Sequence, residues 1–177
     1  MILSAFLVPK KLLANDSFSR VSWKEFWDEA SRLEELVPIL EALEKGTLKL
    51  EIQGSWSLGK VLSHCSQSIQ FSMLGYPEMK SVLFRGSAGK MAFSFFAFRN
   101  KMSHGLEEPI PGGADLSNDV NVQQAAKNLI SDIKLFQSRS KDDLRPHFAY
   151  GELSKEEYDL AHTLHIKNHF DRISLVN

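Results

Sequence analysis

The spacing of the apolar residues constrains the fold of this 177-residue chain most strongly. In several long segments these residues recur every three or four positions, which places them along one face of an α-helix. Long amphipathic helices pack against one another as a bundle, so the pattern predicts an all-α fold. Four or five helices are expected, because the phenylalanine-rich third segment is also compatible with a strand. The ranges are 22–45, 57–74, 88–101, 119–138 and 154–173.

Residues that favour helix ends support these ranges. Gly46 and Gly75 follow the first and second segments, and glycine commonly terminates a helix. Ser154 and Glu157 have the spacing of a capping box at the start of the last helix. Pro38 lies inside the first segment and is expected to kink that helix or split it in two.

An irregular segment from Met102 to Asn118 separates the third and fourth helices. It contains the run PIPGG, whose prolines and glycines disfavour regular structure. Its length favours a functional loop that shapes a pocket, with His104 and Glu107 as its polar contributions. A plain surface connection that only reverses the chain is an equally good interpretation.

Composition places the chain among ordinary soluble globular proteins, with 43% hydrophobic and 24% charged residues. We expect one domain over residues 1–177, with residues 1–20 as an N-terminal arm. The formal charge of −1, with no basic stripe, argues against nucleic acid as a partner. No apolar run approaches the roughly 20 residues that a membrane-spanning helix needs.

Two features suggest a cytoplasmic protein. The single cysteine, Cys65, excludes an intrachain disulfide framework and is expected to be a small core residue. The apolar N-terminus is followed, not preceded, by Lys10 and Lys11, which is the wrong order for a secretory signal.

Histidines give the clearest indication of chemistry. His162, His165 and His169 fall within a stripe about 60° wide on the last predicted helix, facing its apolar side. His64 lies at the edge of the apolar face of the second helix. Neutral imidazoles from two packed helices can bind a divalent transition metal. Core histidines bonded to the backbone or to water are the alternative.

Three segments together resemble a bacterial branch of the DinB-like superfamily. This branch is a family of unknown function. They are SWSLGKVLSHCSQSIQFSMLGYP, MSHGLEEPIPGGADL and PHFAYGELSKEEYDLAHTLHIKNHF, and the resemblance covers Trp56 to Ile173. It implies a metal-binding four-helix bundle, here with an extra N-terminal helical segment and a long irregular loop. Trp56 and Ser57 match the superfamily's helix opening. His64, His165 and His169 match its three metal ligands.

The resemblance also implies a function. It suggests metal-dependent hydrolysis, or transfer of a low-molecular-weight thiol, on a small-molecule substrate, with zinc or nickel as the most expected metal. A homodimer is implied as well. No general base stands beside the histidine pair, where position 166 is Ile166. The alternative is a non-catalytic bundle that the metal stabilises and that binds a small molecule or a protein partner.

The chain departs from the superfamily pattern directly after the histidine pair. Many relatives carry another histidine or an Arg-Gly-Gln-like run there, whereas this chain has Phe170, Asp171 and Arg172. The departure removes no ligand, but it argues against transferring a specific thiol chemistry to this chain.

The other histidines each allow two interpretations. His162 either orients a ligand or lines the site, or it is a half-buried packing residue. His104 either covers the site as part of a lid or lies on the surface. His147 is expected to form part of a turn before the last helix.

Overall fold

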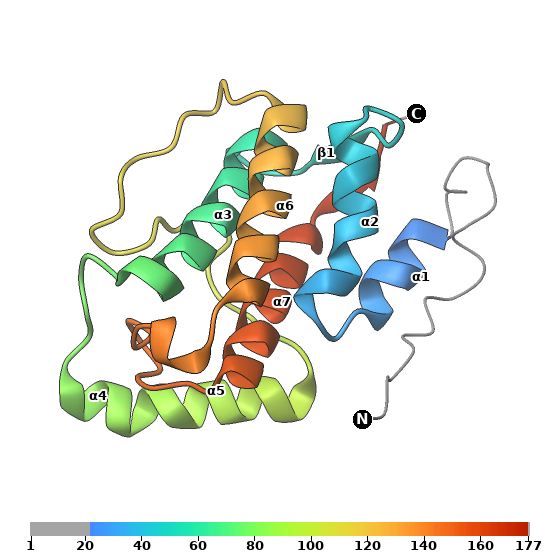
Figure 1. The fold of residues 1–177 in the computed structure, drawn as a ribbon. Helices are drawn as coiled ribbons and strands as arrows, with labels where there is room; N and C mark the ends of the chain where they lie inside the picture. The colour runs from blue at the N-terminus through green and yellow to red at the C-terminus, as the bar shows by residue number, and fades with distance from the viewer. Residues whose placement is uncertain (1–21, 177) are drawn as a thin grey trace.

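Helices dominate the computed structural model, which describes residues 22–176 (Figure 1). The all-α prediction is confirmed, and the phenylalanine-rich segment is a helix. The N-terminal arm, residues 1–20, lies outside the described part of the chain. The helices are α1 (Ser22–Glu29), α2 (Leu33–Glu44), α3 (Leu58–Leu74), α4 (Val82–Gly86), α5 (Ala88–Arg99), α6 (Val122–Ser138) and α7 (Lys155–Phe170).

Four of these helices enclose the core. Helix α6 packs against both α2 and α3, and α7 contacts the same two helices (Figure 1). Their apolar faces meet in one buried cluster, which the helical periodicity predicted. Its fully buried members include Leu36, Leu62, Leu129, Ile133 and Tyr158. This arrangement brings α3 and α7, which carry the histidines, side by side.

The first predicted helix is split, but at Ser31 and Arg32 and not at Pro38, which lies inside α2. Carboxylates explain the position of the break. One oxygen of Glu35 accepts hydrogen bonds from the backbone N–H groups of Ser31 and Arg32. Asp159 of α7 accepts another from the first residue of α2. These bonds satisfy N–H groups that a helix start leaves without partners, so a new helix begins there.

The last helix ends at Phe170, before the predicted end at Ile173. Residues 173–175 instead form strand β2 (Ile173–Leu175), which pairs antiparallel with β1 (Leu50–Ile52). Ile52 lies opposite Ile173, whose side chain is buried. Cross-strand pairing and burial therefore outweigh continuation of the helix. Strands of three residues carry too little periodicity for sequence to predict them.

Helices α4 and α5 run across one end of the others (Figure 1). Several large apolar side chains on them are exposed, namely Val82, Leu83, Met91, Phe95 and Phe98. Between residues 22 and 176, no helix has the length and apolar character needed to cross a bilayer.

Gly59, in the first turn of α3, allows a close backbone approach. A β-carbon built there would lie 2.0 Å from the carbonyl oxygen of Val120 and 2.9 Å from its carbonyl carbon. Backbone atoms cannot rotate away as a side chain can. The absence of a side chain at Gly59 therefore lets the segment before α6 pack on α3, five residues before His64.

We expect Gly59→Ala to lower the free energy of unfolding by about 1–3 kcal/mol, because the new methyl group overpacks a backbone contact. Gly86→Ala is the matched control, since nothing lies within 4 Å of the β-carbon position there. Its effect should stay within about 1 kcal/mol. Urea unfolding followed by circular dichroism would compare the two, and equal stabilities would contradict the packing argument.

Candidate metal centre

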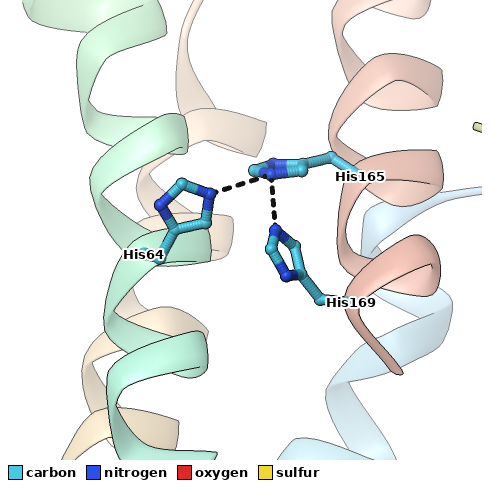
Figure 2. A group of neighbouring side chains, drawn as sticks. All are labelled: His64, His165 and His169. Carbon is cyan, nitrogen blue, oxygen red and sulfur yellow. Dashed lines mark hydrogen bonds between the residues drawn. The ribbon is translucent and has the colours of Figure 1, made fainter. Parts of the chain in front are cut away.

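Three histidines converge between α3 and α7 (Figure 2). The Nε2 atom of His165 lies 3.1 Å from Nε2 of His64 and 3.0 Å from Nε2 of His169. One ligand nitrogen from each ring lies within 4.8 Å of the other two, so the group could hold a metal ion. The sequence therefore selected three side chains that the fold brings to one point.

Capped helices and packed rings position these side chains. The hydroxyl of Ser57 accepts a hydrogen bond from the backbone N–H of Lys60 at the start of α3, and Ser154 and Glu157 form the predicted capping box of α7. Trp56 packs edge-on against the ring of His64, with centroids 5.2 Å apart. The side chain of Trp56, matched through the resemblance, thus forms part of the wall around the histidines.

Hydrogen bonding within the group is incomplete. A neutral imidazole offers one N–H donor and one lone pair. The Nδ1 atoms of His64 and His169 are buried and have no partner in residues 22–176. Two nitrogens bound tetrahedrally to one zinc ion, each at about 2.0–2.1 Å, would be about 3.3 Å apart. The Nε2 atom of His165 lies 3.1 Å from that of His64 and 3.0 Å from that of His169, close to that value, so the residues fit such an ion.

Burial keeps these histidines in the neutral form that a metal requires. It lowers the pKa of His64 to about 4, with His104 and Lys60 adding electrostatic repulsion. Burial also lowers the pKa of His169 to about 2 and holds that of His165 well below its usual range, and neighbouring histidines lower both further. Folding therefore presents lone pairs and not imidazolium ions at neutral pH.

A cavity of about 240 Å³ opens beside the group. His64 and His165 line it on one side, and the irregular loop supplies Met102, His104, Glu108, Pro109, Ile110 and Pro111. A second cavity, of about 150 Å³, also reaches His64 and is lined by Trp56, Lys60 and Glu107. The pocket-shaping interpretation of the loop is confirmed, and the plain surface connection is wrong.

Glu107 anchors this loop to the start of α3. Its carboxylate accepts hydrogen bonds from the backbone N–H of Ser55 at 2.6 Å and from the Ser55 hydroxyl at 2.7 Å. These bonds lower the pKa of the Glu107 carboxyl, so it remains charged. Glu107 therefore holds the loop near the histidines in addition to lining the smaller cavity.

The half-buried side chain of His104 places its ring beside the histidine group. Its ring centroid is 5.0 Å from that of His165 and 5.3 Å from that of His169. Burial lowers its pKa, although Gly105 and Glu108 act in the opposite direction. His104 thus lies half-buried beside the candidate ligands, and its role as part of a lid stays a prediction.

His162 and His147 both line the larger cavity but lie outside the group of three. His162 packs its ring against Tyr158 and Phe136, which agrees with a packing role as well as a lining role. His147 accepts hydrogen bonds from the backbone N–H groups that follow it, as the predicted turn requires. Cys65 is fully buried, as expected of a core residue.

Sequence reasoning missed several residues of the cavity wall. Lys80, Phe148 and Tyr150 line it, and the Tyr150 ring stacks on His147 with centroids 4.2 Å apart. They come from irregular segments, where no periodicity indicates which side chains turn inward.

A comparison with family models identifies the chain. The model described as "Protein of unknown function (DUF1569)" matches residues 29–174, so the chain belongs to this family. No curated protein matches the chain, and no solved structure matches it.

Proposed function

We propose that this member of the DUF1569 family holds one divalent transition metal through His64, His165 and His169 and acts on a small molecule in the adjoining cavity. The reaction would be hydrolysis or transfer of a low-molecular-weight thiol. The observation that carries the proposal is the meeting of three imidazoles, two of which, His64 and His165, line a cavity of about 240 Å³. Buried neutral imidazoles suit zinc or nickel.

A metal there would supply Lewis acidity, which lowers the pKa of a water molecule or thiol bound to it. The protein supplies the rest. Capped helices fix the three imidazoles, and Trp56 restricts the ring of His64. The loop held by Glu107 lines both cavities beside the site. Ile166, buried beside the pair, offers no general base.

We further propose that α2, α3, α6 and α7 are the four-helix bundle of the DinB-like superfamily, with α1 as the extra N-terminal segment. The pairwise packing of these four helices supports this assignment. So does the place of the histidines, with one on α3 and the i,i+4 pair on α7.

The competing proposal is a non-catalytic protein in which the metal only joins α3 to α7. A cavity that reaches two of the three histidines favours the catalytic proposal, because a purely structural site normally has four protein ligands and no open position.

A homodimer also remains a proposal. The exposed apolar residues of α4 and α5, among them Met91, Phe95 and Phe98, offer a surface that a second copy could bury. Light scattering would test it, and a mass of one chain at high protein concentration would contradict it.

Metal content is the direct test of the proposed function. Protein purified without a metal-affinity tag should contain zinc or nickel near one equivalent per chain by elemental analysis. The loaded protein should then turn over a member of a panel of ester, amide and thiol-transfer substrates, and chelation should abolish the turnover. Failure to retain either metal after incubation and desalting would contradict the proposal. Retention without any turnover would favour the structural role.

A further inference from the structure

The loop places a fourth imidazole beside the three candidate ligands. The centroid of the His104 ring lies 5.0 Å from that of His165, the same distance that separates the rings of His64 and His165. His104 lies outside the compact group of three nitrogens but lines the same cavity as His64 and His165. It therefore faces the metal centre without belonging to its set of ligands.

A hydrogen bond sets the tautomer of His104. Its Nδ1 lies 2.7 Å from the carbonyl oxygen of Gly105, which can only accept, so Nδ1 carries the proton of the neutral ring. The lone pair is then on Nε2. That atom is buried and has no partner in the described chain. Because buried polar atoms normally have partners, an unpartnered acceptor on a residue that lines a cavity points to a ligand that supplies a donor. The Nε2 atom of His162, on the same cavity wall, is buried and unpartnered as well, but the ring of His104 is the one that lies beside the rings of both His165 and His169.

The segment that carries His104 is held at two points on the start of α3. Glu107 accepts two hydrogen bonds from Ser55. Asn118, at the other end of the loop, accepts from the Ser57 N–H at 2.9 Å and donates to the Ser55 carbonyl at 3.2 Å. Such anchoring fixes where Nε2 of His104 lies relative to the three histidines.

We propose that Nε2 of His104 accepts a hydrogen bond from whatever molecule occupies the open side of the metal centre, and so favours ligands that carry a hydrogen-bond donor such as a hydroxyl group. Water, alcohols and acids that retain an O–H would be held, while aprotic anions and thiolates would leave Nε2 unpartnered. This inference rests on the proposed metal binding by His64, His165 and His169. Of the two proposed reactions it favours hydrolysis, whose nucleophile is water.

Bicarbonate and acetate are a matched pair of probes, since both are monovalent oxygen ligands but only bicarbonate carries an O–H. Each would be titrated into cobalt-loaded protein at pH 7.5, with the visible absorption of cobalt reporting both loading and ligand exchange. One additional hydrogen bond predicts that wild-type protein binds bicarbonate roughly three- to tenfold more tightly than acetate. His104→Ala and His104→Leu should bring this ratio near one. Gly86→Ala, where nothing lies within 4 Å of the β-carbon position and which does not line the cavity, should keep the wild-type ratio.

The outcomes separate the proposed role of His104 from the proposed metal binding on which it rests. Wild-type protein that fails to bind cobalt would overturn the proposed function. Wild-type protein that binds cobalt but does not distinguish the two anions would overturn the role of His104 alone. A preference for bicarbonate over acetate that persists in both His104 variants would also overturn the role of His104. Loss of cobalt from these variants would make His104 a ligand and would also overturn the proposed role.

Discussion

His165→Gln should abolish stoichiometric metal binding and leave a folded, helical protein. His165 is the central member of the group, because its Nε2 atom lies within 3.1 Å of those of both His64 and His169. An amide side chain is a much poorer ligand than imidazole for zinc or nickel. The buried core formed by α2, α3, α6 and α7 does not depend on a metal, unlike that of a small zinc finger.

Thermal unfolding with and without zinc would measure the change. A metal present at a hundredfold excess over its Kd stabilises the wild-type fold by about 2.7 kcal/mol, and the variant should lose this increment. His162→Gln is the matched control, since it removes an imidazole one turn earlier on α7 that is not in the group of three. It should keep both the metal and the increment. Complete unfolding of His165→Gln would instead show that the metal is structural.

Local geometry made part of this site predictable. The i,i+4 spacing of His165 and His169 places both rings on one face of a helix whatever the rest of the chain does. Nothing in local spacing could bring His64 to them, because about a hundred residues intervene. The grouping of His64 with His165 and His169 was predicted from the resemblance to a metal-binding superfamily. In the structure, the packing of α3 against α7 brings the three side chains together.

The features that sequence reasoning missed depend on contacts between distant residues. The helix break at Ser31 and Arg32 is stabilised in part by Asp159, which lies on α7. Strand β2 forms because β1, far away in sequence, offers it a partner. The inward position of His104 depends on the loop anchor between Glu107 and Ser55. Periodicity and capping rules describe one segment at a time, so they cannot predict contacts between distant segments.

Metal-free protein should lose stability steeply as the pH falls below about 6.5, the ordinary pKa of histidine. All six histidines of the chain have lowered pKa values, with burial as the largest cause in each case. The unfolded chain therefore binds more protons than the folded one at mildly acidic pH. Stability is fully present above pH 6.5 and decreases as the pH falls towards the folded-state pKa values.

His162 allows this prediction to be quantified. Burial lowers its pKa to about 3, and its side chain is 2% exposed. Between pH 6.5 and 4.5 this one residue should cost about 2.7 kcal/mol of folding free energy, at about 1.4 kcal/mol per pH unit. Urea unfolding of wild-type protein and His162→Gln at pH 7.5, 5.5 and 4.5, both free of metal, would give the difference. The variant should show the shallower dependence on pH.

Zinc should shift the loss of stability to lower pH, because a bound metal and a proton compete for the same imidazole nitrogens. The shift should appear in His162→Gln as well, since that residue lies outside the group of three. It should be absent in His165→Gln. Stability that stays flat down to pH 4.5 without metal would mean that the histidines are hydrated and not buried, and the description of the site would then be wrong.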